Sequence, residues 1–375
     1  MLRLVIELRM ILTVVLVAFQ FLGLLPAQAA IMPVSWPWYG VSMDSLSSNP
    51  EDLHRYHAQL GIDTVRLQLK PTKLAKRTNI SPDAAWDKSM LWLDAMLDTS
   101  KRLHIRAIIN LSYFPIDPAY VPNSKIKIAQ YTPEFWSDPS QLNGVVATVT
   151  RLMKHLRARG EEFAAIDIMS EPGVRDGPRL VAPDKWEGLM KRVIKAIRAE
   201  RLDLWILLSP PPQGLVTSYS GFKPFEDGRI IYNAHIYLPH QFASQGIGKK
   251  PIGVEYPGYV NGKKWDTKEL WNAMQPLRDF QRKYDLPVIV GEFSAVRWAG
   301  GSEQYIRDLA AIFDEFGWSW FYFSGSGWHG WNPDYNQNYP GMDKLSAGAW
   351  KQDYVGAKTE RWNTLRTIFK VQGNK

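Results

Sequence analysis

Two kinds of apolar pattern alternate along the chain. Short runs of apolar or β-branched residues are separated by longer segments in which apolar residues recur every three to four positions. The short runs are typical of buried strands, and the longer spacing places apolar side chains on one face of a helix. The short runs lie at 39–43, 64–69, 106–111, 163–169, 204–208, 230–234, 288–290 and 319–323. Eight strands alternating with helices predict an α/β fold, a (β/α)8 barrel of the TIM type.

The segments between these runs indicate one domain. Helical spacing is clear over 145–156, 186–197 and 305–316, whereas 210–219 gives little helical signal. We therefore expect the helix after the fifth strand to be the weakest. No Gly/Ser linker, charge block or internal repeat interrupts 30–375, which we interpret as a single (β/α)8 domain. An open doubly wound sheet is the structural alternative, but no glycine-rich phosphate loop follows a strand.

Residues 1–29 have a different pattern. Arg3 and Arg9 precede an apolar run over 10–25, and the small-residue triplet Ala-Gln-Ala ends at Ala29. This three-part arrangement is typical of a secretory signal peptide, so we expect export to the periplasm or the medium and no stable membrane association after cleavage. An uncleaved single-span anchor is the alternative.

Composition excludes several kinds of chemistry. The chain has 375 residues, is 45% hydrophobic and contains no cysteine. The hydrophobic content excludes a disordered chain, and the missing thiols exclude a cysteine nucleophile, an iron–sulfur cluster and a thiolate zinc site. The seven histidines form no HExxH motif, and His54 and His57 have no third ligand nearby in the sequence. We predict no metal and no cofactor.

Two glutamates follow runs that should be buried. Glu171 comes after 163–169 and Glu292 after 288–290. In a closed parallel barrel the carboxyl ends of the strands meet at one face, where active sites lie, so both carboxylates should face the same cavity. One protonated and one ionised carboxylate are the groups that hydrolyse a glycosidic bond. A single strand-end glutamate is more often a helix N-terminal acid or an ion-pair partner, but two at matching ends favour catalysis.

Other polar side chains occupy further strand ends. Arg66 lies in the second run, and His235 and Tyr237 follow the sixth. Arg66 is alternatively part of a structural ion pair, and His235 a core histidine with satisfied hydrogen bonds.

Several motifs resemble glycoside hydrolase family 5, the cellulase family. The resemblance runs in the family's order from about 39 to 335. IDIMSEPG at 166–173 resembles the Asn-Glu-Pro signature of the acid/base strand, and VIVGEFSAV at 288–296 resembles the nucleophile strand. The family's strand-two arginine and strand-six His-x-Tyr have counterparts in VRLQL at 65–69 and HIY at 235–237. YLPHQFASQG at 237–246 and GWSWFYFSGSGWHGW at 317–331 resemble segments of some bacterial members.

The resemblance implies a retaining double displacement. Glu171 would protonate the leaving sugar oxygen while Glu292 attacks the anomeric carbon, and Glu171 would then act as base for water. Arg66 and Tyr237 would hold Glu292 ionised, and His235 would orient the pair.

The chain also departs from the family pattern. The family's asparagine before the acid/base, which contacts the substrate 2-hydroxyl, is Ser170 here. The third strand ends with Ser112 and Tyr113, where the family usually has a histidine, and we expect both to contact substrate. The strand-eight aromatic that floors the cleavage site falls near Phe323, with Trp328 as a substitute from the loop. These changes bear on substrate preference and rate more than on the class of reaction, since both carboxylates are kept. A barrel that binds glycan with weak turnover is an alternative.

Aromatic side chains in loops are candidates for binding sugar rings, which present apolar C–H faces. By this criterion we expect Trp136, Trp298, Trp328 and Trp331 to contact substrate. The tryptophans at helical spacing, expected in the core, are Trp86, Trp92, Trp186, Trp271 and Trp362. Long loops at 115–139 and 238–266 would wall an open cleft, which favours endo action over a closed exo pocket.

A binding protein without catalysis is the second function class. The net charge is +8, and lysines at 249–250 and 263–264 lie near Tyr256, Tyr259 and Trp265. This is a weak signal for nucleic acid or another polyanion, and a solvated loop face is the simpler interpretation. The sequence therefore predicts a monomeric, retaining endo-β-1,4-glucanase that acts on polysaccharide, not nucleic acid. A β-mannanase or another β-glycosidase of the family is the alternative.

Overall fold

The computed structural model describes residues 31–113, 132–159, 163–177, 179–248, 250–339, 341 and 348–373. Within them, eight parallel strands form a closed barrel in the order β1-β12-β11-β8-β7-β4-β3-β2. The barrel strands are β1 (Tyr39–Asp44), β2 (Thr64–Leu69), β3 (Arg106–Leu111), β4 (Ala165–Ile168), β7 (Trp205–Leu208), β8 (Ile230–Ile236), β11 (Val288–Phe293) and β12 (Ser319–Tyr322). The predicted (β/α)8 barrel is confirmed, and the expected signal segment lies outside the described residues.

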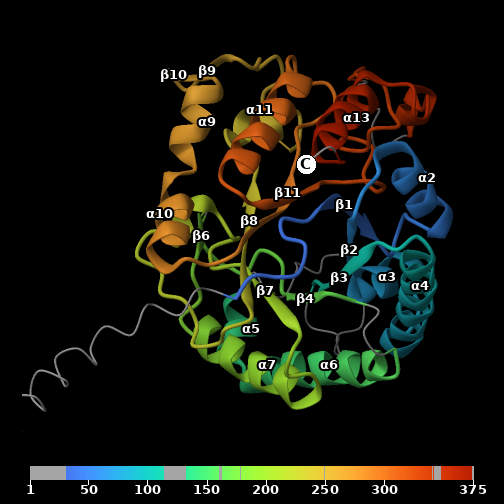
Figure 1. The fold of residues 1–375 in the computed structure, drawn as a ribbon, viewed down its shortest axis with the longest axis vertical. Coiled ribbons are helices and arrows are strands. Elements are labelled where there is room, and N and C mark those ends of the chain that lie inside the picture. Colours follow the sequence, from blue (N-terminus) through green and yellow to red (C-terminus); the bar gives the residue numbers. More distant parts are fainter. Residues whose placement is uncertain are drawn as a thin grey trace, which may run out of the picture.

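Helices surround the barrel (Figure 1). The longer ones are α2 (Pro50–Leu60), α4 (Pro82–Arg102), α6 (Pro139–Arg157), α7 (Trp186–Glu200), α10 (Gln275–Tyr284), α11 (Ser302–Glu315) and α13 (Glu360–Gly373). Only the 3-10 turn η2 (Val216–Tyr219) fills the weak position between β7 and β8. Among the described residues, no helix has the length and apolarity to cross a bilayer.

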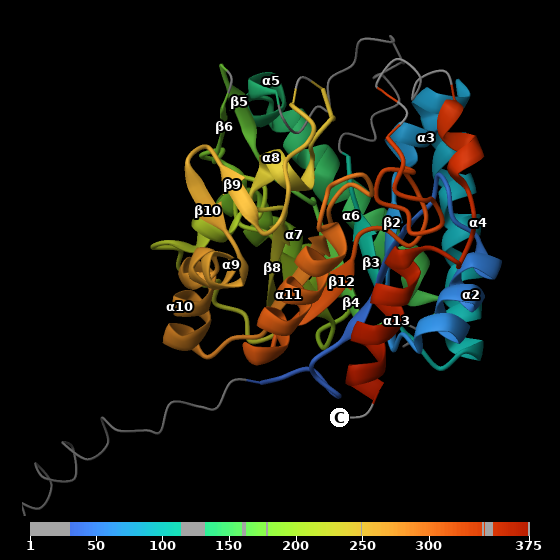
Figure 2. The same ribbon diagram turned by 90° about the horizontal axis from the view of Figure 1, so that it is seen from above.

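Shorter elements decorate the barrel. They are α3 (Pro71–Thr78), α5 (Pro133–Ser137), the hairpin β5 (Val174–Asp176) and β6 (Arg179–Val181), α8 (His240–Ala243), the hairpin β9 (Gly258–Val260) and β10 (Lys263–Trp265), α9 (Thr267–Ala273) and η3 (Ala349–Asp353). Figure 2 shows α3, α5 and the β5–β6 hairpin at one end of the molecule. The expected loop at 238–266 thus contains a helical turn and a hairpin, whereas most of 115–139 lies outside the described residues.

Local sequence explains where helices begin. Proline occupies the first position of α2 through α6, where its missing N–H needs no partner. Asn49 caps α2 through a reciprocal pair of hydrogen bonds with Asp52, and Gly61 ends it at φ 65°.

The core has two parts on opposite sides of the strands. The inner part fills the barrel and consists of Trp38, Ile108, Ala165, Trp205, Leu207, Ile231, Ile289 and Phe321. The larger outer part lies between strands and helices and includes the residues that alternate with these, such as Val41, Ile109 and Ile166. Because side chains alternate along a strand, this division tells which strand positions point into the barrel.

Candidate active site

The inner apolar layer gives way to a polar layer toward the carboxyl ends of the strands. Inward positions two residues beyond the apolar layer carry Asn110 after Ile108, Asp167 after Ala165, and Asn233 after Ile231. These polar side chains are buried. The barrel therefore has a dry floor of apolar side chains beneath a cluster of groups that must satisfy one another.

A β-bulge directs Glu292 into this cluster. Ile289 points inward, so strict alternation would turn position 292 outward, toward the helices. Instead β11 carries one extra residue relative to β8 just before Glu292. Gly291 occupies the bulge, donates its N–H to Asn233 Oδ1 at 2.9 Å, and leaves no room for a Cβ, which would lie 2.4 Å from that oxygen. Phe293 then returns to the outer core.

Glu292 is buried and accepts hydrogen bonds from three side chains. Arg66 Nη1 and Gln68 Nε2 donate to Oε1 at 3.0 and 2.8 Å, and Tyr237 Oη donates to Oε2 at 3.1 Å. Burial by itself raises the pKa of Glu292, but the charges of His235 and Arg66 outweigh it, and the pKa lies below its usual value. This carboxylate is held ionised.

Arg66 is a buried cation that links Glu292 to the polar side chains at the end of β4. Its Nε donates to Asp167 Oδ2 at 2.8 Å and its Nη2 to Ser170 Oγ at 2.8 Å, in addition to the contact with Glu292. Burial opposes the charge of Arg66, but Asp167 and Glu292 raise its pKa above the usual value. Asn110 also donates to Ser170 Oγ, at 3.0 Å, so Ser170 is anchored by two strands.

Glu171 stands opposite Glu292 on a strained turn. The φ angles of Met169 and Glu171 are 63° and 56°, a region that costs a non-glycine residue roughly 1–3 kcal/mol and is typical of functional sites. Glu171 Oε1 lies 3.0 Å from His235 Nδ1. Burial would lower the pKa of His235, but Glu292 and Glu171 raise it above its usual value.

The catalytic candidates converge closely. One side-chain atom from each of Glu171, His235 and Glu292 lies within 4.8 Å of the others. Such a triad has the composition of a metal site, but both oxygens of Glu292 already accept hydrogen bonds, and one of the donors is the Arg66 cation. A metal cation there would face a guanidinium, so these surroundings fit a free carboxylate better than a metal ligand. The absence of a metal stays a prediction.

Three of the four predicted loop tryptophans lie near this site. Trp331 packs on Tyr237 and Phe323, with ring centroids 5.7 and 5.5 Å apart. Trp328 packs against Trp331 at 5.0 Å and is 37% exposed. Trp298 is half-buried next to Trp328, at 5.7 Å. Trp328 therefore offers an accessible aromatic face at the edge of the site.

The fourth, Trp136, is not an exposed platform. It lies in α5 rather than a loop, is buried, and donates from Nε1 to the Gly173 carbonyl at 3.2 Å. The hydrogen bond to Gly173, just before β5, ties α5 to the β5–β6 region, and the indole packs edge-on against Phe135 of the same helix. Of the tryptophans expected in the core, three are buried and two half-buried; they are Trp86, Trp186 and Trp362, and Trp92 and Trp271.

The two predicted residues at the end of β3 have different surroundings. Ser112 is buried, and its Oγ donates to Asn110 Oδ1 at 2.5 Å, which makes it a support for Asn110. Tyr113 is half-buried at φ 68° with the Lys73 ammonium 3.6 Å from its ring centroid. Buried position and nearby carboxylates, Glu171 first among them, raise the pKa of the Tyr113 phenol.

A cavity of about 310 Å³ adjoins Glu171. His235, Tyr237 and residues from the loops after β7 and β8 line it, among them Gln213 and His240. Glu292 is not part of its lining. The cavity therefore lies on the Glu171 side of the carboxylate pair.

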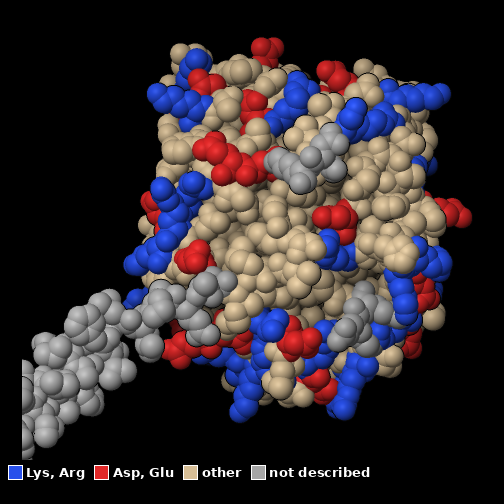
Figure 3. All heavy atoms as spheres, viewed as in Figure 1, with Lys and Arg blue, Asp and Glu red and all other residues tan. Residues whose placement is uncertain are grey.

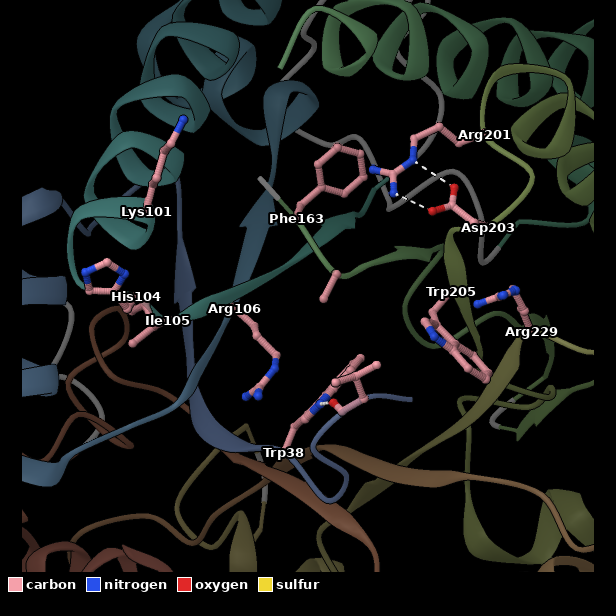
Figure 4. A pocket seen from close by; sticks show the side chains of 12 residues that line it. Trp38, Lys101, His104, Ile105, Arg106, Phe163, Arg201, Asp203, Trp205 and Arg229 are labelled. Atoms are coloured by element: carbon pink, nitrogen blue, oxygen red, sulfur yellow. Dashed lines mark hydrogen bonds and ion pairs between the residues drawn. The ribbon is translucent and has the colours of Figure 1, made fainter. Parts of the chain in front are cut away.

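A different pocket, of about 600 Å³, lies at the amino-terminal end of the barrel (Figure 4). Basic side chains and the rings of Trp38 and Trp205 line it. The Arg201 guanidinium is 3.3 Å from the Asp203 carboxylate, the single acid in the lining. With no carboxylate pair, this pocket does not offer the groups for glycoside hydrolysis.

The surface charge is mixed in sign. Basic and acidic side chains are interspersed around the face shown in Figure 3. In the lysine segment singled out as a polyanion signal, Lys263 pairs with Glu269 at 2.5 Å and Lys264 with Asp266 at 3.1 Å. These lysines therefore form ion pairs within the chain.

Comparison with known proteins agrees with this geometry. Residues 27–328 match the model of the cellulase family, glycosyl hydrolase family 5. The chain belongs to glycosyl hydrolase family 5. Members of this family hydrolyse O-glycosyl bonds. A curated relative of this family 5 chain is Endoglucanase C of Acetivibrio thermocellus, 21% identical over 288 residues, which are 69% of this chain and 78% of the relative.

Solved structures share the barrel of this family 5 chain. A hyperthermophilic endo-β-1,4-glucanase in complex with substrate has a TM-score of 0.62 at 19% identity, covering 84% of this chain and 96% of the other. Thermotoga maritima Cel5A in complex with mannotriose has a TM-score of 0.61 at 16% identity, covering 79% and 92%.

Sequence reasoning left three residues of the site without a role. Gln68 and Asp167 occur there only within the motifs VRLQL and IDIMSEPG, and Asn110 only within the apolar run at 106–111. Each lies on an inward strand position, two residues from another inward residue, and that alternation was the available signal.

Proposed function

We propose that this chain is an endo-β-1,4-glucanase that cleaves with retention, with Glu292 as nucleophile and Glu171 as acid/base. The observation that carries the proposal is the short separation of the two carboxylates, within 4.8 Å between one atom of each. Retaining enzymes hold their carboxyl groups about 5–5.5 Å apart, whereas inverting enzymes leave about 6.5–9.5 Å for a water. The spacing here supports direct attack on the sugar.

The surroundings of each carboxylate support its role. Glu292 accepts hydrogen bonds from Arg66, Gln68 and Tyr237, which keep it ionised for attack. Glu171 adjoins the cavity of about 310 Å³, where a leaving sugar would take its proton.

In the first step an oxygen of Glu292 bonds to the anomeric carbon as the bond to the leaving oxygen breaks, and that oxygen takes the Glu171 proton. In the second, Glu171 takes a proton from water as the water oxygen displaces Glu292. His235, in contact with Glu171 Oε1, orients the acid/base in both steps.

The names of the relatives guide the choice of substrate. The curated relatives of this chain are endoglucanases, and one structural neighbour is an endo-β-1,4-glucanase in complex with its substrate. The mannotriose complex of another neighbour keeps β-mannan as the second candidate. A glycan-binding barrel with weak turnover is the alternative outside the enzyme class, since Ser170 replaces the family asparagine.

The test compares wild type, Glu171→Gln and Glu292→Gln on β-1,4-glucan, mixed-linkage glucan and mannan. Glu187→Gln, on the exposed surface of α7, is the matched control. We expect each catalytic variant to lose at least 10²-fold in kcat, the control to match wild type, and the first product to carry the β-anomeric configuration by NMR. Inactivity of wild type on every glycan, near-normal turnover by either catalytic variant, or an α-configured first product contradicts the mechanism.

Export and a monomeric state belong to the same proposal. We expect the N-terminus of protein recovered from the periplasm or medium to be Ala30, and sedimentation to give the mass of one chain. Full-length protein retained in the membrane would contradict the signal assignment.

A further inference from the structure

Charged side chains around the carboxylate pair are matched with opposite charges. Arg66 contacts both Asp167 and Glu292. At the carboxyl ends of β1 and β2, the Lys70 ammonium lies 3.0 Å from Asp44 Oδ2, and both residues are buried. In these pairs each buried cation faces at least one carboxylate, so its charge is compensated.

Lys73 is the exception. It lies in the first turn of α3, half-buried, and among the described residues no acid is within ion-pair distance of its ammonium. Its ammonium instead sits 3.6 Å from the ring centroid of Tyr113, and the left-handed φ of 68° at Tyr113 is a strained conformation for a tyrosine. A half-buried ammonium that pairs with no acid among the described residues is costly, so this arrangement is suited to a ligand that supplies an anion.

The electrostatics agree with this placement. Burial and the neighbouring Lys70 lower the pKa of Lys73 to about 8, while Asp44, Glu171 and Glu292 act in the opposite direction. Lys73 is thus close enough to sense both catalytic carboxylates without pairing with either.

Lys73 also lies on a defined side of the cleavage point. It follows β2, and Tyr113 follows β3, whereas the cavity beside Glu171 is lined by the loops after β7 and β8, across the barrel. If the leaving sugar occupies that cavity, the opposite side holds the glycone, the part of the substrate that bonds to Glu292.

We propose that Lys73 and Tyr113 form a subsite for an acidic substituent on the glycone side, so that the preferred substrate is an acidic β-glucan. The ammonium pairs with a carboxylate or phosphate carried by the sugar, and a cation–π contact with the Tyr113 ring stabilises the ammonium. A neutral glucan gives this charge no ion-pair partner, and the described part of the chain supplies none either. This inference rests on the proposed glucanase function and names its substrate class.

The test measures kcat/KM on carboxymethylcellulose and on neutral hydroxyethylcellulose for wild type, Lys73→Met and Lys73→Arg. Lys76→Met, on an exposed position one turn further along α3, is the matched control. We expect Lys73→Met to lower the ratio of acidic to neutral activity about tenfold or more, as for the loss of a hydrogen bond to a charged group. Lys73→Arg should keep most of the ratio, and added salt should reduce it in wild type.

A ratio unchanged in Lys73→Met, or reduced equally in the Lys76 control, overturns the subsite. A binding measurement separates this failure from failure of the glucanase proposal. In the Glu292→Gln background, calorimetry compares a carboxylated and a neutral cello-oligosaccharide with Lys73 present and with Lys73→Met. A Lys73-dependent preference for the acidic ligand upholds the subsite even without turnover, and equal affinities overturn it.

Discussion

Replacing Arg66 with methionine tests the buried charge network that holds Glu292, the proposed nucleophile. The substitution keeps most of the side-chain volume but removes the guanidinium from between Asp167 and Glu292, whose side chains are buried. Removing one partner of a buried ion pair typically costs about 3–5 kcal/mol, since it leaves an uncompensated charge. For a chain of this size that corresponds to a melting temperature lower by roughly 4–7 °C.

Asp167→Asn provides the matched second variant for a double-mutant cycle. Urea unfolding of wild type, both single variants and the double variant should show that the double variant loses at least 1 kcal/mol less than the sum of the singles. The reason is that asparagine at 167 removes one of the two carboxylates that Arg66→Met leaves unpaired. Additive free energies of unfolding would show that Arg66 and Asp167 do not stabilise each other.

The same cycle has a catalytic readout that stability alone would not change. The pKa of Glu292 is lowered in the folded protein, so its ionisation stabilises the fold above about pH 4.3, and this contribution is lost as pH falls through the folded pKa. Without Arg66 that pKa rises, and the acidic limb of the kcat/KM profile should move to higher pH in Arg66→Met. The double variant should not restore it. An unmoved limb would refute the role of Arg66 in keeping Glu292 ionised.

Three further predictions concern other parts of the site. Gly291→Ala should lower kcat at least 10²-fold, since its Cβ would displace Asn233 and tilt the bulge; near-normal kcat contradicts this. Trp136→Ala should cost about 3–5 kcal/mol in unfolding with little change in KM, whereas Trp328→Ala should raise KM with little loss of stability; the reverse would restore Trp136 as a sugar platform. His235 has a raised pKa, so its charge stabilises the fold below about pH 6.5, and this contribution is lost as pH rises through the folded pKa. The difference in melting temperature between wild type and His235→Gln should therefore be largest below about pH 6.5 and become smaller as pH rises through the folded pKa; a difference independent of pH contradicts this.

The fold was predictable because a parallel barrel repeats one simple pattern. The predicted bounds of β2 and β3 match the structure, since apolar or β-branched residues dominate both strands and each ends on a leucine. β8 and β11 extend beyond the predicted runs to Ile236 and Phe293. The predicted runs ended early because His235 is polar and Glu292 follows a glycine, and these are the two side chains that face the site.

The site was predictable in its chemistry but not in its supports. The two carboxylates were marked by strand position. Alternation along the strand could have placed Asp167 and Gln68 inside the barrel, but their hydrogen-bond partners lie on other strands, so the sequence did not reveal their roles. Trp136 was assigned to a loop because a five-residue helix is too short to show periodicity. Lys73 was missed because an amphipathic helix start gives no sign that its cation lacks an anion.

The bulge at Gly291 makes the direction of the Glu292 side chain depend on the number of residues before it in β11. With the bulge kept, deleting one residue between Val288 and Gly291 would reverse this parity and turn the carboxylate at 292 toward the helices, whatever the loops do. Loops after the strands carry no such parity and tolerate changes in length. We therefore expect this barrel to tolerate changes of length in its loops, but not single-residue insertions or deletions in the short stretch of β11 before the bulge.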